Sequence, residues 1–250
     1  MHLMNAFGIP IRVHWSFLVL VAGYAIYALA SGGMSGLGIA LVLGTALFAS
    51  VVLHELGHAL AARHYNIDTA HITLYPFGGV AAIKQMPRTA REEFVIAIAG
   101  PAVNVALTAI FGALYLLVGG RLILIIAAIN LIMGVFNLIP AFPMDGGRVL
   151  RAALSTRMGW LPATELSLRV AGYFAWAFIG LGVLTTSLNL LFIGGFLHFA
   201  IASERRRVRW SAHHGEPPSW TRPRSHSHSR FHHRHPTHRG PTTRAAGRLT

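Results

Sequence analysis

The residues with the clearest chemical potential form a His-Glu-x-x-His segment, residues 54–58, inside an otherwise apolar stretch. A helix turns about 100° per residue, so His54 and His58 share one face and can direct both imidazoles at a single metal ion. Glu55 projects from the adjoining side, where its carboxylate can accept a proton from a metal-activated water. The segment therefore predicts the metal-binding helix of a hydrolase.

A third metal ligand must come from elsewhere in the chain, and the absence of cysteine leaves only His, Asp or Glu. Most acidic residues of the apolar region lie beside basic residues, but Asp145 follows a Pro-rich segment and precedes two glycines that let the backbone turn. A catalytic zinc typically has three protein ligands and one open position. We expect His54, His58 and Asp145 to hold one Zn²⁺ per chain, although a similar ligand set also binds non-haem iron.

The composition places these residues in a membrane protein. Hydrophobic residues make up 54% of the 250 residues and charged residues only 12%, about half the charged fraction of a typical soluble domain. The net charge of +13 is concentrated at the C-terminus, where residues 203–250 contain 11 Arg and two acidic residues. Few charges therefore remain in residues 1–202, which form the membrane-embedded domain.

Six apolar segments are candidates for membrane spans, which makes the fold class an all-α polytopic membrane protein. They cover about residues 14–30, 37–62, 94–118, 122–139, 168–184 and 188–201. The first segment also has the composition of a signal-peptide core, which is the alternative for it. The residues before it form a short amphipathic lead.

A small β segment is expected between the second and third spans. Residues 71–75 alternate polar and apolar side chains, and Gly78 and Gly79 follow a proline. An apolar strand beside a metal-binding helix is a candidate edge for holding an extended peptide through backbone hydrogen bonds. An irregular interfacial loop is the alternative.

The distribution of Lys and Arg predicts the orientation. If both termini are cytosolic, nine basic residues of residues 1–202 lie on the cytosolic side and only Arg121 lies outside. The second and fourth spans then run in the same direction, and residues 54–58 and Asp145 approach the cytosolic face at similar depth. We therefore expect a multi-pass protein of the cell membrane.

These motifs resemble the site-2 protease family of intramembrane zinc metalloproteases. The resemblance covers about residues 1–202 and rests on residues 54–58, on residues 137–147 with their Pro-Ala-Phe-Pro-Met-Asp-Gly-Gly core, on Gly78-Gly79 and on residues 8–15. It implies cleavage of membrane-anchored proteins, with Asp145 as third ligand and Glu55 as base. It also implies that Asn104 and Asn137 position the substrate or its oxyanion. The chain has no room for a PDZ domain between the metal motifs, and its C-terminus does not resemble CBS modules.

The C-terminal residues 203–250 hold eight of the 15 histidines and are expected to be disordered. They have three interpretations: contact of Arg205–Arg209 with anionic lipid headgroups, weak metal collection, or no dedicated role. Nucleic-acid binding is not expected, because no aromatic stacking pattern accompanies the charge.

The sequence is compatible with two functions. The first is an intramembrane zinc endopeptidase that cleaves a single-span or membrane-tethered protein near the cytosolic leaflet, in regulated intramembrane proteolysis. The second is a divalent-metal transporter, suggested by the intramembrane His and Asp residues and the His-rich C-terminus. An inactive membrane scaffold would leave the complete set of ligands and base unexplained.

Overall fold

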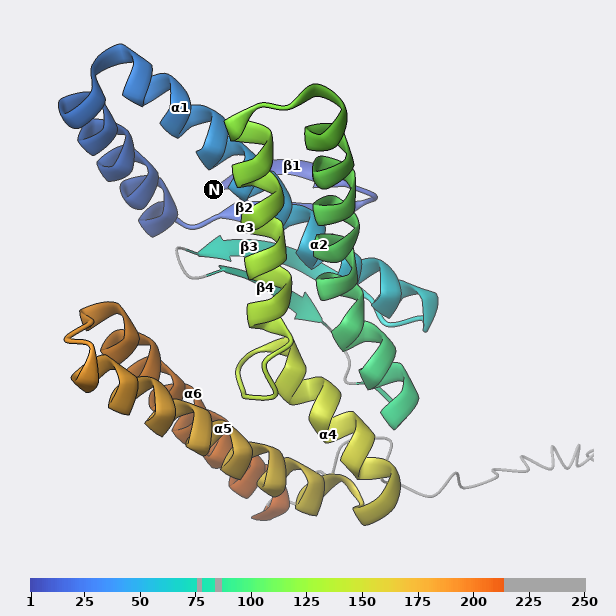
Figure 1. Ribbon diagram of the computed structural model, residues 1–250. Coiled ribbons are helices and arrows are strands. Elements are labelled where there is room, and N and C mark those ends of the chain that lie inside the picture. The colour runs from blue at the N-terminus through green and yellow to red at the C-terminus, as the bar shows by residue number, and fades with distance from the viewer. Residues whose placement is uncertain (76–77, 84–86, 214–250) are drawn as a thin grey trace, which may run out of the picture.

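The computed structural model describes residues 1–75, 78–83 and 87–213 as a bundle of helices beside one small sheet (Figure 1). The elements in chain order are β1 (His2–Ala6), β2 (Ile9–Val13), α1 (Trp15–His64), β3 (Thr69–Tyr75), β4 (Gly78–Ile83), α2 (Ala90–Val118), α3 (Arg121–Asn137), α4 (Asp145–Met158), α5 (Trp160–Leu184) and α6 (Leu188–His213). The mainly helical fold with a small β segment between the second and third apolar segments confirms the coarse prediction.

Helix α1 consists of two helical segments joined at Gly33, which has a φ of 59°. This left-handed conformation favours glycine because it has no Cβ. The two segments fold back on each other in Figure 1. They approach closely, since a Cβ on Gly36 would lie 2.6 Å from the carbonyl oxygen of Ala28. Gly33 lies between the first two predicted apolar segments, residues 14–30 and 37–62.

The membrane character of the helices is confirmed, but a six-span arrangement is not established. Among the described residues, α1, α2 and α5 are long and apolar enough to cross a membrane, and α3 is a shorter apolar helix. Large apolar side chains such as Leu116 and Leu117 are 83% and 84% exposed, as expected of a surface that faces lipid. Helix α6 continues to His213, beyond the expected end of the last span at residue 201. Residues 214–250 of the predicted disordered segment lie outside the described residues.

The N-terminal residues form part of the sheet, which corrects the expectation of a simple amphipathic lead. The sheet order is β1-β2-β3-β4. Strand β2 pairs in parallel with β3, with Ile11 opposite Ile72, while the other two pairs are antiparallel. The pairing of β2 with β3 cannot be predicted from the local pattern of residues 1–13, because β3 lies some 60 residues further along the chain.

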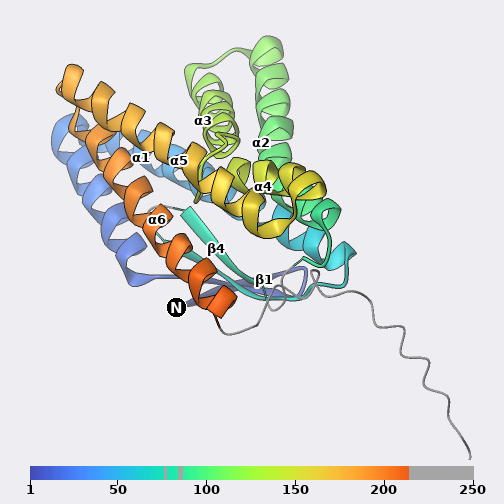
Figure 2. The ribbon, with the colours of Figure 1, turned by 90° about the horizontal axis from the view of Figure 1, so that it is seen from below.

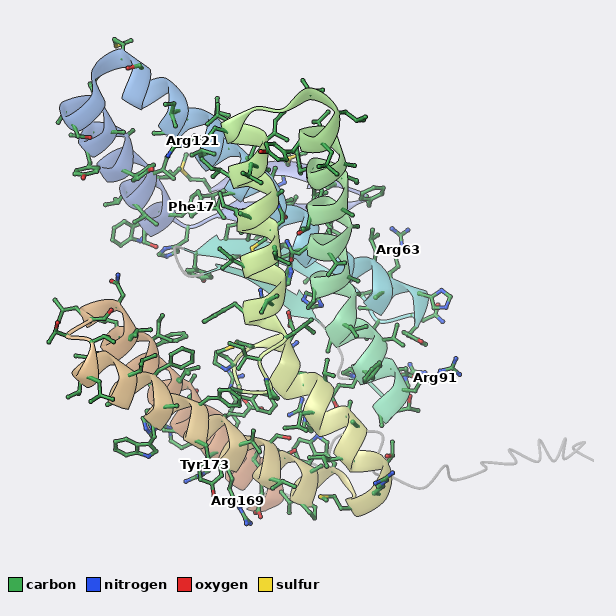
Figure 3. All side chains as sticks on the ribbon, in the orientation of Figure 1. Phe17, Arg63, Arg91, Arg121, Arg169 and Tyr173 are labelled. Atoms are coloured by element: carbon green, nitrogen blue, oxygen red, sulfur yellow. The ribbon has the colours of Figure 1, made fainter. Side chains whose placement is uncertain are left out.

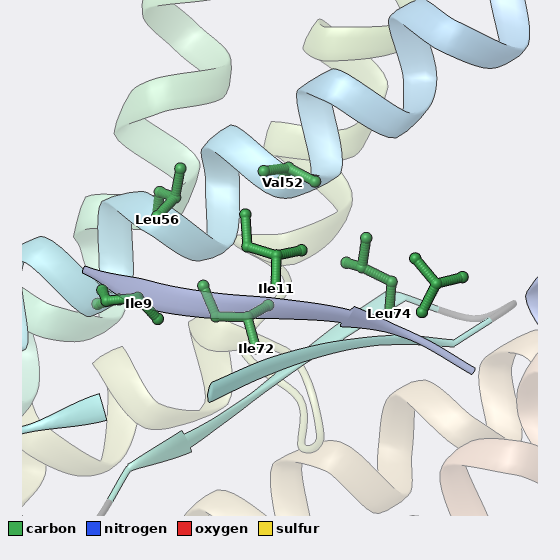
Figure 4. Packing of buried hydrophobic residues seen from close by; sticks show 8 residues of the cluster. Ile9, Ile11, Val52, Leu56, Ile72 and Leu74 are labelled. Atoms are coloured by element: carbon green, nitrogen blue, oxygen red, sulfur yellow. The ribbon is translucent and has the colours of Figure 1, made fainter. Parts of the chain in front are cut away.

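The sheet packs directly on the helix that contains the metal motif (Figure 4). Ile11, Ile72 and Leu74 are buried against Val52 and Leu56 of α1. Val52 and Leu56 are four positions apart and therefore share a face. This packing fixes the rotation of α1, so that His54 and His58 face α2 and α4.

Residues 138–144, which precede Asp145, are held in place by a second apolar cluster. Ala141, Phe142 and Met144 are buried against α5 and α6, which lie side by side in both views (Figure 1, Figure 2). A Cβ on Gly146 would lie 2.3 Å from the carbonyl oxygens of Leu138 and Ile139. Glycine is therefore required where this segment folds over the start of α4.

An ion-pair network connects α4 to its neighbours. The guanidinium group of Arg151 pairs with the buried carboxylate of Glu93 on α2 and lies 3.6 Å from a carboxylate oxygen of Glu204 on α6. It also lies 5.0 Å from the centre of the Phe142 ring. Arg151 thereby links the helix that begins at Asp145 to α2, to α6 and to the preceding segment.

Candidate metal centre

Two remote parts of the chain bring three metal-ligating atoms together. The Nε2 atoms of His54 and His58 are 3.1 Å apart, and they lie 3.2 Å and 3.1 Å, respectively, from Oδ2 of Asp145. Both histidines are buried, and 13% of the Asp145 side chain is exposed. The structure therefore brings together the three residues that the sequence predicts as zinc ligands.

The opposite ring nitrogen of each histidine is held by an oxygen acceptor. Nδ1 of His58 donates to the backbone carbonyl of Ile96 at 2.7 Å, and Nδ1 of His54 donates to Oδ1 of Asn104 at 2.5 Å. When Nδ1 has the proton, Nε2 of a neutral imidazole presents a lone pair. Both histidines thus direct lone pairs toward Asp145, the arrangement typical of metal-bound imidazoles.

This arrangement fits a divalent cation. With both Nδ1 atoms protonated, two imidazole lone pairs and a carboxylate oxygen face one another as acceptors, and either a proton or a metal cation among them removes their repulsion. The ligands of a tetrahedral zinc with bonds of about 2.0–2.1 Å are about 3.3 Å apart. The three separations of 3.1–3.2 Å between the ligand atoms are close to this value, so His54, His58 and Asp145 would hold a zinc ion and leave a position for water or substrate.

Helix α2 packs against the rings of His54 and His58 at Gly100. A Cβ on Gly100 would lie 2.2 Å from Nε2 of His58 and 2.8 Å from Nε2 of His54. The helices also approach closely at Gly57, whose Cβ would lie 2.8 Å from the carbonyl oxygen of Ala99. Small residues at both positions let the α2 backbone pack directly against the metal-binding helix.

Glu55 lies beside strand β4. Its side chain is buried, and a Cβ on Gly79 would lie 2.3 Å from its Cγ. The backbone of Gly79 therefore runs directly past the expected general base. In the described part of the sheet, β4 pairs with β3 alone and forms one edge.

The other predicted site residues are Asn104, Asn137 and Gly78, and of these three only Asn104 is hydrogen-bonded to a metal ligand. Asn104 is fully buried and lies on the far side of His54, which differs from the substrate contact implied by the resemblance. Asn137 ends α3 and donates to the carbonyl oxygen of Met133 at 3.0 Å. Gly78 begins β4 with a φ of 132°.

Sequence reasoning missed three residues of this centre. They are Gly100, Asn130 and Ile96, of which Ile96 contributes only its backbone carbonyl. Gly100 lies in a Gly-Pro pair within an apolar segment, a signal that could have marked a close helix contact. A buried Asn such as Asn130, in the middle of an apolar segment, is a comparable signal.

The fold and the site define a membrane-embedded, zinc-binding helical protein with an acidic residue beside its metal ligands. Residues 42–123 and 120–180 match the model of peptidase family M50. The chain belongs to this family.

Individual relatives agree with this assignment. A zinc metalloprotease of Methanocaldococcus jannaschii is 37% identical over 218 residues, which are 82% of this chain and 60% of the relative. Rip3 of Mycobacterium tuberculosis is 36% identical over 225 residues, covering 80% of this chain and 57% of the relative. The chain thus spans less than two thirds of these relatives.

A solved structure matches over nearly its whole length. It is the site-2 protease from Methanocaldococcus jannaschii, which superposes with a TM-score of 0.62 at 35% identity and covers 82% of this chain and 94% of that chain. This chain is therefore similar to that protein in the arrangement of its helices as well as in sequence.

Proposed function

We propose that this chain is an intramembrane zinc endopeptidase that cleaves membrane-anchored proteins. The observation that supports this most directly is the His54–His58–Asp145 triangle with Glu55 on the next position of the same helix. Bound Zn²⁺ would act as a Lewis acid that polarises the scissile carbonyl and makes a water molecule acidic. The remaining steps depend on the residues of the chain.

Glu55 is the proposed general base. It accepts a proton from the attacking water as the water oxygen forms its bond to the carbonyl carbon. It then returns the proton to the amide nitrogen as the carbon–nitrogen bond breaks. Its burial against Gly79 keeps the carboxylate close to the ligands and limits competing water.

Strand β4 is the proposed docking edge for the substrate. A peptide bond inside a helix is shielded by neighbouring turns, so the segment to be cut must be extended, and an extended segment can add to a free sheet edge. Gly78 and Gly79 lie at the start of β4, and the absence of a side chain on Gly79 lets its backbone lie directly beside Glu55. Asn137 is proposed to orient the substrate or its oxyanion at the end of α3.

The protein is proposed to have both termini in the cytosol, so that cleavage takes place near the cytosolic leaflet. Arg91 and Arg121 lie at opposite ends of the α2–α3 pair (Figure 3). Arg121 is the exception in the charge count, and the remaining basic residues mark the cytosolic face.

Anionic lipid headgroups are the proposed partners of the C-terminal arginines. Arg205 and Arg169 line a cavity of about 390 Å³ between α5 and α6, together with Tyr173 and Trp176. Arginines with aromatic residues are typical of the interface between membrane and water.

Replacement of Glu55 tests the proposed function. We expect Glu55→Gln to retain one zinc per chain, because the three ligands are unchanged, and to lose peptidase activity by about 10²–10⁴-fold, the usual contribution of a general base. Glu165→Gln, which changes a carboxylate that is 58% exposed, is the control.

The measurement combines zinc content of the purified protein with comparative proteomics of membrane fractions. A membrane-tethered protein should accumulate in cells with Glu55→Gln and not with Glu165→Gln. If Glu55→Gln cleaves this protein at the wild-type rate, the proposed function is wrong. Metal flux through proteoliposomes that depends on His54, without any cleavage, would establish the transporter instead.

A further inference from the structure

A chain of buried amides runs from α3 through α2 to the zinc ligand His54. Nδ2 of Asn130 donates to the carbonyl oxygen of Ile126 at 3.0 Å, and Oδ1 of Asn130 accepts from Nδ2 of Asn104 at 3.0 Å. Oδ1 of Asn104 in turn accepts from Nδ1 of His54 at 2.5 Å. Asn104 and Asn130 are both 0% exposed, so water does not compete for these bonds.

The donor-to-acceptor direction of these hydrogen bonds is fixed by the contact between Asn130 and Ile126. The carbonyl oxygen of Ile126 is an acceptor only, so the amide nitrogen of Asn130 must face it, and the amide oxygen of Asn130 must face Asn104. Asn104 then has to present its nitrogen to Asn130 and its oxygen to His54. His54 consequently has its proton on Nδ1 and a lone pair on Nε2, the atom that faces Asp145 and His58.

The alternative orientation would disable the ligand. If the Asn104 amide were reversed, its NH₂ group would face Nδ1 of His54. The imidazole proton would then move to Nε2, where it would point at the metal and prevent coordination. Close packing of α2 against α3 holds the two amides in place, since a Cβ on Gly134 would lie 3.2 Å from Cβ of Asn104.

We propose that Asn130 is a positioning residue for zinc binding, which acts through Asn104 by fixing the tautomer of His54. The side-chain hydrogen bonds of Asn130 connect it to Asn104 and Ile126 and not to a metal ligand itself. The inference rests on the proposed function only in requiring that His54 binds zinc. It assigns Asn104 to support of a ligand and not to contact with substrate.

The test compares two substitutions of Asn130. Asn130→Leu fills similar volume but removes the acceptor for Asn104, so the Asn104 amide can reverse. We expect its zinc affinity to fall by about 10- to 100-fold, as for other groups that orient metal-binding histidines. Asn130→Asp, as a neutral carboxylic acid, retains an oxygen acceptor for Asn104 and an O–H donor for the Ile126 carbonyl, and we expect it to remain within about threefold of wild type. Asn189→Leu, at an exposed position of α6, is the control for an Asn-to-Leu change in an apolar helix.

Zinc affinity is measured by competition with a chelator in detergent, and thermal unfolding of the metal-free variants shows whether they fold. A double-mutant cycle adds a readout that a merely structural role would not affect. In an Asn104→Ala background, Asn130→Leu should cause no further loss of zinc affinity, because its effect passes through Asn104. The ¹⁵N shifts of the imidazole, assigned to His54 by comparison with His54→Gln, should report Nδ1–H in metal-free wild type and Nε2–H in Asn130→Leu.

The outcomes separate this inference from the proposed function. Wild-type affinity in a folded Asn130→Leu variant, full additivity in the cycle, or an unchanged tautomer would overturn the role of Asn130 and leave the zinc peptidase intact. Failure of the wild-type chain itself to bind zinc would overturn both.

Discussion

At the scale of residues, the centre depends on which nitrogen of each imidazole has the proton. His54 and His58 bind an acceptor through Nδ1 and therefore present Nε2 toward Asp145. Four positions of separation on a helix explain why the rings are neighbours, but not why both lone pairs converge. Convergence comes from α2, which supplies the Ile96 carbonyl and the Asn104 amide.

Gly100 provides a test at this scale. We expect Gly100→Ala to lower zinc affinity by about 100-fold or more, because the new Cβ would lie 2.2 Å from Nε2 of His58 and displace the ring from its position. Gly112→Ala is the matched control, since the same helix has open space at that position. Equal zinc affinity of the two variants, measured by chelator competition, would contradict the close packing of α2 on the metal centre.

At the scale of elements, the decisive feature is how α4 is held, since its first residue is Asp145. The preceding segment is buried against α5 and α6, and Arg151 joins α4 to Glu93 and Glu204. Neither constraint is visible in the local sequence of α4. The ligand is thus placed by contacts that involve three other helices.

Arg151→Met tests this arrangement. It leaves the Glu93 carboxylate buried without its partner, which typically costs about 3–5 kcal/mol. We expect a lower thermal unfolding temperature in detergent and weaker zinc binding through displacement of α4. Arg157→Met, at an exposed position of the same helix, should have little effect.

A second substitution distinguishes an unpaired charge from lost packing. In the double variant Arg151→Met with Glu93→Leu, the isolated buried charge is gone, and much of the stability should return. If Arg151→Met is as stable as wild type, the ion pair does not hold α4.

At the scale of the whole molecule, the distribution of charge along an apolar chain predicts the orientation in the membrane. The chain has no cysteine, so single cysteines report on topology without background. We expect Thr156→Cys on α4 to react with an impermeant maleimide only from the cytosolic side, and Thr185→Cys at the end of α5 only from the outside. Both positions are exposed. Labelling of both from the same side would contradict the proposed orientation.

The sequence by itself determined the chemistry of the site and the division into apolar segments. The residue types at positions 54, 55, 58 and 145 are those that zinc hydrolases require. The first three are spaced to lie on one helix, and Asp145 directly follows a proline-rich segment. The break near Gly33 and the alternating strand at residues 71–75 are also local patterns, which is why they could be predicted.

Only the tertiary structure decided what supports that chemistry. The pairing of β2 with β3, the contact of Gly100 with the histidines and the amide chain from Asn130 to His54 join residues distant in the sequence. Each depends on how close two backbones come and on which atom of a side chain faces its neighbour. Hydrophobic periodicity specifies which face of an element is buried, but it does not specify the partner, and the partner determines the direction of every hydrogen bond at this centre.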